Sequence, residues 1–453
     1  GVINLKIKFI LPALEEAKSP YWRPIKYSLF PPLGLATLAS FCGEEDEIEI
    51  VDEHIETLKL DDFPDLVCIE TYITNSYRAY EIADNYRKKG VTVALGGLHA
   101  TSVPYEAKKH CDVILLGLGE SSFPKFLKEL KEGRNKKIYN QGDVCFDSIP
   151  LPRRDLFKND KYLVPNSMVF SRGCPNKCSF CYVSSFYKGG KSYYSYKIDR
   201  ILEEIDSMKG RHLYFLDDNI FANKNLVRQL FKEMKGMNRV FQGAITVDSV
   251  LNDDTIELAY EAGFRSAFIG FESINQINLK SANKLSNLGQ DYQKAIKRLD
   301  EIGIMINGSF IFGLDDDKKD VFSRTTEWAI DNGITTVTNH ILTPYPGTPI
   351  FEEMKKTNRI VTEDWRKYDT RHLTFNHPNI TKEEMEKGYK ESYEEFYKWS
   401  NIFKDSKNHE ELKMKLKHFT YAGACKKFEP VWNFLIKTEM LPKARRVLVN
   451  TLK

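Results

Sequence analysis

Residues 171–182 read SRGCPNKCSFCY and place Cys174, Cys178 and Cys181 in a C-x3-C-x2-C spacing. The chain has eight cysteines in 453 residues, which is too few for a disulfide framework. Three of them in so short a stretch therefore indicate reduced thiols that bind one metal group together. Structural zinc sites usually take four Cys or His ligands, whereas three thiolates suit a four-iron cluster in which one iron keeps an open position.

The flanking sequence favours such a cluster over the alternatives, a zinc site or an electron-transfer cluster. The nearest following histidine, His212, lies thirty-one residues beyond Cys181, so no fourth ligand is indicated. Gly173 and Pro175 favour a tight loop directly after the apolar run SMVFS, and Tyr182 puts an aromatic ring beside the third thiolate.

The overall composition predicts a soluble globular protein with two or three packed domains. The chain is 42% hydrophobic and 12% aromatic, and its 66 basic and 63 acidic side chains leave a formal net charge of only +3. Nothing in this balance predicts nucleic acid as a partner. No run reaches the roughly 18 apolar residues that span a bilayer, and the first residues do not read as a signal peptide. We therefore expect a cytoplasmic protein.

The order of apolar runs predicts two α/β domains. Residues 1–140 alternate short strands with amphipathic helices, as in a Rossmann-like doubly wound parallel sheet, and the helix over 76–90 ends on Gly90. A charged, turn-rich linker is expected at 141–160. Six further strands alternate with helices over 161–375 and predict a partial (βα)6 barrel, followed by a helical C-terminal region at 376–453.

The cysteine motif, on the loop after the first barrel strand, resembles that of the radical S-adenosylmethionine enzymes. The resemblance implies a [4Fe-4S] cluster held by Cys174, Cys178 and Cys181. In that family S-adenosylmethionine chelates the open iron through its amino and carboxylate groups, and the reduced cluster cleaves it to a 5'-deoxyadenosyl radical. Three cysteines would then be the number that leaves one iron free for this cofactor.

Other segments of the barrel extend the resemblance. LDDN, with Asp217, Asp218 and Asn219, ends the second strand where the family usually carries Gly-Gly-Glu to hold the amino group of the cofactor. The resemblance further implies that Glu272 binds the ribose hydroxyls, that Gly308 and Gly313 let the backbone approach adenine, and that Tyr345 in LTPYPGTP faces the active site. Taken singly, Glu272 is more often a helix-cap or salt-bridge acid, and a Gly-Leu-Asp turn is more often merely a turn.

The domain in front of the barrel resembles the cobalamin-binding branch of the same superfamily. The segments PPLGLATLAS, VDEHIE, GGLHATSVPYEA and GLGESS carry this likeness. Gly96 and Gly97 would let a bulky macrocycle approach the backbone, and His99, Thr101 and Ser102 offer hydrogen-bond donors to it. The alternative is that the Gly-Gly pair only ends a strand.

His54 is a candidate for the lower ligand of cobalt. Asp52-x-His54-x-x-Thr57 approaches the D-x-H-x-x-G motif of methionine synthase, but it follows the second strand instead of the first and ends in Thr57. We therefore expect His54 to be a surface or loop-packing histidine. A low-polarity lower face built by Tyr72 and Ile73 is the preferred alternative.

Together the two cofactors imply transfer of a methyl group to an unactivated carbon. The alternatives are a radical rearrangement, cyclisation or other bond-forming step, and, more remotely, a non-catalytic redox or cofactor carrier. The expected partners are a small-molecule or lipid substrate and a reductant such as flavodoxin or ferredoxin. Residues 401–453 carry twelve Lys or Arg against five Asp or Glu, which fits an anionic substrate, peripheral membrane contact or simply a solvated helical cap. The stretch with Tyr193, Tyr194 and Tyr196 fits a substrate channel or ordinary packing.

Overall fold

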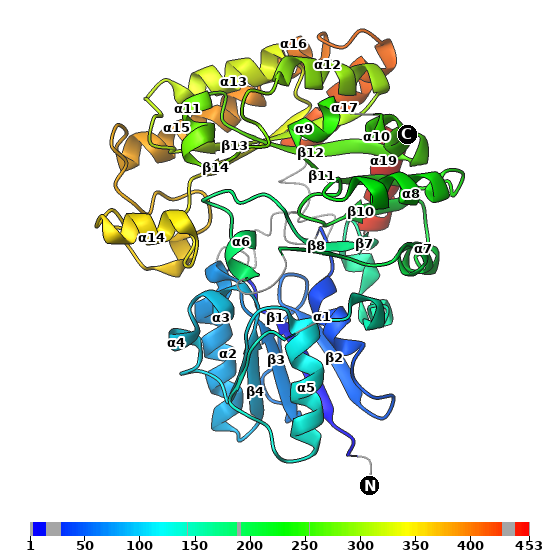
Figure 1. Ribbon diagram of the computed structural model, residues 1–453, viewed down its shortest axis with the longest axis vertical. Coiled ribbons are helices and arrows are strands. Elements are labelled where there is room, and N and C mark those ends of the chain that lie inside the picture. Colours follow the sequence, from blue (N-terminus) through cyan, green and yellow to red (C-terminus); the bar gives the residue numbers. More distant parts are fainter. Residues whose placement is uncertain are drawn as a thin grey trace.

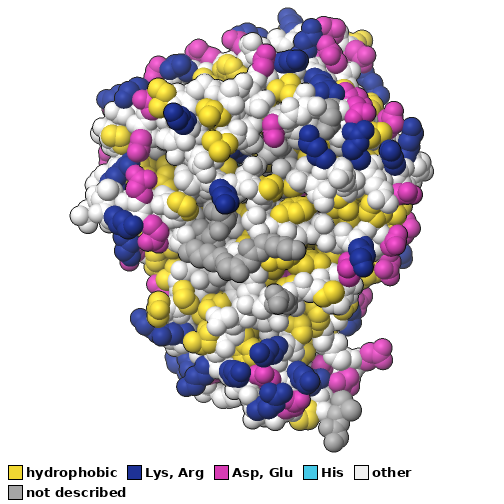
Figure 2. Space-filling view, in the orientation of Figure 1, with side chains coloured by type: hydrophobic (Ala, Val, Ile, Leu, Met, Phe, Trp, Pro, Cys, Tyr) yellow, Lys and Arg dark blue, Asp and Glu magenta, His cyan; other side chains and the backbone are white. Residues whose placement is uncertain are grey.

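The computed structural model describes residues 3–14, 29–142, 144–187, 192–252, 254–427 and 440–452. Two six-stranded sheets dominate it, which we call sheet A (N-terminal) and sheet B (central). They lie one above the other along the long axis of the molecule (Figure 1). In the view of Figure 2, hydrophobic side chains gather at the waist where the two sheets meet, while Lys, Arg, Asp and Glu are concentrated toward the two ends.

Sheet A is parallel throughout and has the strand order β2-β1-β3-β4-β5-β6. Its elements are β1 (Lys6–Leu11), α1 (Leu33–Ala39), β2 (Glu47–Asp52), β3 (Leu66–Glu70), η3 (Ile73–Asn75), α2 (Ser76–Lys88), β4 (Thr92–Gly96), α3 (Leu98–Ser102), α4 (Pro104–Ala107), β5 (Val113–Leu115), α5 (Gly119–Lys131) and β6 (Ile138–Tyr139). Ile7 and Phe9 of β1 pack in the core under α1 and α5, whereas Ile10 packs in the core under α2. The doubly wound prediction is confirmed.

The order of sheet A creates a crevice. The chain passes from β1 to β2 on one side and then to β3 on the other, so the loops after β1 and β3 diverge. Ligands of such sheets bind at this switch point, outside the carboxyl ends of the strands. The sixth strand, β6, was not expected from the sequence, since two residues are too few to show a period.

Sheet B has the order β14-β13-β12-β11-β10-β7 and is also parallel. Its elements and flanking helices are β7 (Ser167–Met168), β8 (Ser171–Gly173), α6 (Val183–Phe186), β9 (Tyr193–Ser195), α7 (Ile198–Ser207), β10 (His212–Phe215), α8 (Lys224–Met234), β11 (Val240–Ile245), α9 (Val247–Leu251), α10 (Thr255–Ala262), β12 (Phe264–Glu272), α11 (Gln276–Ser281), α12 (Tyr292–Ile302), β13 (Met305–Phe312), α13 (Val321–Asp331), β14 (Thr336–Ile341) and α14 (Pro349–Lys356). The six expected strands are present. SMVFS, however, divides between β7 and the start of β8, which pairs antiparallel with β9.

Helices follow the barrel, as the sequence predicts: α15 (Lys382–Phe396), α16 (Trp399–Ser406), α17 (Leu412–Lys427) and α19 (Leu441–Leu452). In the part of the chain that the structure describes, no helix has the length and apolar character needed to cross a bilayer. The segment FEPVWNFLI of the basic C-terminal region lies outside the described residues.

Two tyrosines of α15 protect the edge strand β14. The backbone N–H of Asn339 donates to the Tyr393 hydroxyl at 2.8 Å, and that of Val337 donates to the Tyr397 hydroxyl at 3.3 Å. Each hydroxyl donates back to the carbonyl of the same residue, at 3.3 Å and 3.4 Å respectively. Edge strands otherwise present unpaired backbone groups, so these side chains take the place of a neighbouring strand.

Candidate active site

A large cavity lies between the two sheets. It lies between the carboxyl edge of sheet A and the inner face of sheet B, and its volume is about 2250 Å³. Sheet A contributes Tyr72 and Ile73 after β3, and the barrel contributes Tyr214, Asn307 and His340. Ligand pockets usually measure roughly 300–1,000 Å³. The cavity therefore has room for more than one large molecule.

The cysteine loop leaves the β8–β9 hairpin at Gly173. This glycine has φ +85°, and a side chain there would collide with the backbone carbonyl of Ser192, so only glycine fits. Cys178 is buried, and Cys174 and Cys181 are partly buried. The loop is tied to the segment after α11, because the N–H of Ser179 donates to the carbonyl of Ala282 at 2.9 Å.

The thiols fit a four-iron cluster better than a single metal ion. Within the described ranges, no three His, Cys, Asp or Glu side chains converge closely enough to hold one ion. A four-iron cluster makes no such demand, because each thiolate binds a different iron. Burial raises the pKa of the Cys181 thiol to about 12, and the charge of Lys284 acts in the opposite direction on the pKa values of Cys174 and Cys178. The lysine therefore favours the thiolates that a cluster requires.

Lys284 belongs to a buried ion pair beside the cysteines. Its Nζ lies 2.9 Å from Oε1 of Glu272, and both side chains are about one-tenth exposed. Glu272 ends β12 with φ +62°, in the left-handed region that costs free energy for a side chain other than glycine. The surroundings hold it there, since Asn287 donates to the carbonyls of Gly270 at 2.8 Å and Phe271 at 3.0 Å. Sequence analysis identified Glu272 but missed Lys284, which has no motif around it.

The three polar residues of LDDN have different surroundings. Asp217 accepts hydrogen bonds from the backbone N–H of Phe170 and from the N–H and hydroxyl of Ser171, which ties β10 to the start of the cysteine hairpin. Burial raises the pKa of Asp217 to about 7. Asn219 accepts from the N–H of Phe221 at 3.1 Å in a local turn.

Asp218 differs from its two neighbours because its side chain is exposed. It lies close enough to Cys174 and Cys181 to raise the pKa of both thiols. Burial nevertheless raises the pKa of the Asp218 carboxyl, which also accepts a hydrogen bond from the backbone N–H of Gly173. Its place next to the cysteines makes it the candidate among the three for contact with a ligand there.

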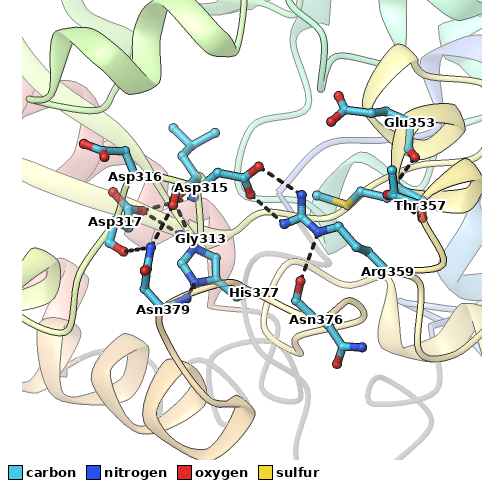
Figure 3. Close-up of polar contacts among 12 residues, drawn as sticks. Gly313, Asp315, Asp316, Asp317, Glu353, Thr357, Arg359, Asn376, His377 and Asn379 are labelled. Carbon is cyan, nitrogen blue, oxygen red and sulfur yellow. Dashed lines mark hydrogen bonds and ion pairs between the residues drawn. The ribbon is translucent and has the colours of Figure 1, made fainter.

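The turn after β13 is held by a network of carboxylates (Figure 3). Asp317 accepts from the N–H groups of Gly313 at 2.8 Å and Leu314 at 3.1 Å, while Arg359 makes two hydrogen bonds to Asp315 at 2.9 Å and 2.6 Å. Gly313 has φ +97°. A side chain at Gly308 would meet Ile334, Phe310 and Phe271 of the barrel core. The missing side chain of Gly308 thus serves packing, and a role of its backbone toward adenine stays a prediction.

The predicted cobalamin residues of sheet A mostly bind one another. A side chain at Gly97, which has φ +99°, would stand 2.9 Å from the carbonyl of Thr71, so this glycine permits close packing of β3 and β4. Thr101 accepts from the N–H of Gly117 at 3.0 Å and donates to the carbonyl of Gly97 at 2.8 Å. Gly96, by contrast, has room for a side chain, since its nearest neighbour would be 3.6 Å away. Ser102 is partly buried at the end of α3.

His99 is fully buried beneath this edge and does not reach the cavity lining. Its Nε2 lies 2.8 Å from the Tyr80 hydroxyl, which donates to Glu106 at 2.9 Å. The indole N–H of Trp365 donates to the same carboxylate at 3.0 Å. Nε2 of His99 also lies 3.4 Å from Oε1 of Glu106. The hydrogen bonds to Glu106, that from His99 first, lower the pKa of Glu106 to about 2. His99 therefore links sheet A to the segment after the barrel, a role that the motif did not predict.

His54 lines the cavity, but both of its ring nitrogens are engaged. Nδ1 lies 2.8 Å from Oδ1 of Asp52, and Nε2 accepts from the N–H of Leu14 at 3.3 Å. The Tyr162 hydroxyl donates to the other oxygen of Asp52 at 2.9 Å. This arrangement agrees with a loop-packing histidine. Tyr72 and Ile73 line the cavity above the switch point, where the predicted low-polarity face would stand.

Two further contacts position the cysteine hairpin. Tyr345 and Tyr182 both line the cavity and lie close enough that Tyr345 raises the pKa of Tyr182. Arg172, on β8, pairs with Glu120 at the start of α5 at a distance of 2.7 Å. This ion pair joins the cysteine hairpin to sheet A, and sequence analysis missed it because its partners are far apart in the chain.

In contrast, Tyr194 and Tyr196 pack against Phe146, with ring centroids 4.7 Å and 5.7 Å apart. Neither lines the cavity. The packing alternative therefore describes these two tyrosines.

Fold, cysteine loop and cavity together define a class: a metal-cluster enzyme with a second cofactor domain in front. The family model of the radical SAM superfamily matches residues 168–329. Bacteriochlorophyllide d C-12(1)-methyltransferase of Chlorobaculum tepidum is 32% identical over 388 residues, covering 82% of this chain and 84% of that protein. The chain therefore belongs to the radical S-adenosylmethionine superfamily, in its cobalamin-binding branch.

Two other comparisons agree. The anaerobic magnesium-protoporphyrin IX monomethyl ester cyclase of Rubrivivax gelatinosus is 26% identical over 395 residues, covering 75% of this chain and 69% of that protein. The solved structure of OxsB, a cobalamin-dependent S-adenosylmethionine radical enzyme with aqua-cobalamin and S-adenosylmethionine bound, has a TM-score of 0.69 at 14% identity. It covers 100% of this chain and 78% of OxsB, and it confirms the fold. The cofactors of this branch are a [4Fe-4S] cluster, S-adenosylmethionine and cobalamin.

Proposed function

We propose that this enzyme transfers a methyl group to an unactivated carbon of a large, mainly apolar small molecule. The observation that carries the proposal is the continuous cavity, which runs from the switch point of sheet A, past Tyr182 beside the cysteines, into the barrel. When bound, the cofactors supply a radical for hydrogen abstraction and a methyl donor. A shared cavity lets the same substrate carbon face both.

Within this proposal, the residues have distinct tasks. Cys174, Cys178 and Cys181 hold the cluster, and Asp218 accepts a hydrogen bond from the amino group of S-adenosylmethionine. The Lys284–Glu272 pair places a carboxylate where ribose hydroxyls would lie, while its ammonium balances the thiolate charge.

Cobalamin would rest over the switch point, against Tyr72 and Ile73. Tyr345 and Tyr182 form the wall that faces the substrate and exclude water from it. The electron comes from a cytoplasmic reductant such as flavodoxin or ferredoxin.

The closing test uses S-adenosylmethionine labelled in its methyl group. The anaerobically reconstituted protein, reduced and supplied with hydroxocobalamin, should form 5'-deoxyadenosine and move the label to cobalamin before any substrate is known. Label that appears only in methionine, which is released together with 5'-deoxyadenosine, and never on cobalamin would reject methyl transfer.

The second candidate is a radical cyclisation without methyl transfer. The likeness to the anaerobic cyclase named above favours it. It predicts that 5'-deoxyadenosine forms in the presence of cobalamin without any label on cobalamin or on an extracted product. The same experiment therefore separates the two reactions.

A further inference from the structure

The outer face of the C-terminal helices α16 and α17 carries large hydrophobic side chains. Trp399 and Phe403 of α16, and Leu412, Leu416 and Phe419 of α17, are between 38% and 71% exposed. Positions 412, 416 and 419 follow the i, i+4, i+7 spacing of one helix stripe, and 399 and 403 the i, i+4 spacing of another. We call these five residues the apolar face.

The two stripes form one surface. The rings of Trp399 and Phe419 lie 5.8 Å apart, which joins α16 to α17 at one end. The helices are joined by only a short connection and run back along one another. Phe403 and Leu416 each stand about one helical turn from that ring contact, on the two helices that pack together. Contiguous exposed apolar surface of this kind marks an interaction site.

The charges around the apolar face are mainly positive. Residues 399–420 contain five lysines and three acidic side chains, of which Asp405 is buried. Lys407 lies over the Phe403 ring at 4.3 Å, and Lys413 and Lys415 flank the stripe of α17. Lysines around an apolar stripe that contains Trp and Phe are the pattern of helices that lie in a membrane interface.

From these observations we propose that the α16–α17 face docks on an anionic lipid surface. The docking stands on the exposed residues and their charged surroundings alone.

The test is flotation of the full-length protein with vesicles. Wild type should float with vesicles of phosphatidylcholine and phosphatidylglycerol and stay below with phosphatidylcholine alone. The floated fraction of the double variant Phe403→Asp and Leu416→Asp should be at least about tenfold lower than that of wild type, since the variant removes apolar contact and adds negative charge. Phe63→Asp is the matched control, because Phe63 is 70% exposed on the other domain, and it should float like wild type.

Folding and self-association are checked in the same samples. Both substituted residues are exposed, so the double variant should keep the thermal unfolding midpoint and the cluster absorption of wild type. Failure of wild type to float, or equal flotation of the double variant, would overturn the proposal. A wild-type dimer that the double variant converts to monomer would assign the face to a second copy of the chain. None of these readouts requires turnover, so failure of the proposed reaction is distinguishable.

Discussion

The carboxyl edges of the two sheets differ in the residue that occupies the left-handed backbone position at the end of a strand. At the edge of sheet A, the left-handed position after β4 is a glycine, Gly97. Thr101 bonds the backbone there and His99 bonds Tyr80, although the buried Nδ1 of His99 has no hydrogen-bond partner. At the edge of sheet B, the left-handed position at the end of β12 is Glu272, whose carboxylate is paired with Lys284 beside the cysteines. The edge of sheet A therefore has a glycine where the backbone is left-handed, whereas the edge of sheet B has a strained, charged side chain there.

This difference indicates what each edge can contribute to cofactor binding and to the chemistry. At the edge of sheet A, a large cofactor can lie without displacing the hydrogen bonds that the protein groups already make. A strained, charged edge stores free energy in groups that a cofactor can engage. We therefore expect substitutions at sheet B to abolish chemistry, and substitutions at sheet A to change stability or cofactor retention.

The largest effect is expected for Cys178→Ala. Removing one of three thiolates should reduce iron and sulfide content and 5'-deoxyadenosine formation to background, because the remaining two cannot hold the cluster. Elemental analysis and chromatography measure both. Cys145→Ala, an exposed thiol outside the triplet, is the control and should behave as wild type; equal iron in both variants would contradict the assignment.

Next in size is Lys284→Met. It leaves Glu272 as an unpaired buried charge, which costs about 3–5 kcal/mol. The double variant Lys284→Met with Glu272→Gln should be less destabilised than the single variant, although both should bind S-adenosylmethionine poorly. Urea unfolding and calorimetric titration supply the two readouts. Additive losses in unfolding free energy would show that the pair does not interact.

Sheet A is probed by His99→Gln and Tyr72→Ala. His99→Gln should cost about 1–3 kcal/mol, because Tyr80 and Glu106 lose a buried partner, but it should leave cobalamin retention after gel filtration unchanged. Tyr72→Ala, at a cavity-lining position, should lower retention with little loss of stability. The reverse pattern would restore His99 as a cofactor residue.

The smallest effect concerns pH and Asp317. Burial raises the pKa of Asp317 to about 7, compared with about 3.9 in an unfolded chain. Its contribution to stability is therefore complete below about pH 4 and is lost as the pH rises through about 7. Asp317→Asn has no carboxyl group to ionise, so its stability does not fall in this way. The difference by which its urea midpoint lies below that of wild type should therefore shrink between pH 5.5 and pH 8.5. A constant deficit would show that Asp317 does not titrate in this range.

Much of the fold could be predicted from the sequence because parallel strands buried on both faces are apolar runs. Periodicity located five strands of sheet A and all six of sheet B, and the cysteine spacing placed the reactive loop. It could not find β6 or β9, which are too short to show a period, or the pairing of β8 with β9, which depends on contacts made across the loop.

The site was harder to predict where a residue type has several uses. Gly97 and His99 stand in a motif that suggests cofactor contact, yet one permits close packing of two strands and the other fills a buried network. Lys284 and Arg172 carry no local signal, because their importance comes from partners distant in sequence, Cys178 and Glu120. A motif identifies residues by their spacing along the chain, whereas the roles of these residues depend on which other residues the fold brings close to them.

The tyrosine hydroxyls along β14 connect the edge of the sheet to the cavity. A helix, and not another strand, completes the hydrogen bonding of Val337 and Asn339 at this edge. Tyr393 and Tyr397 also line the cavity, so the side chains that complete the edge are part of the cavity wall. A substitution at either tyrosine therefore alters the sheet edge and the cavity together.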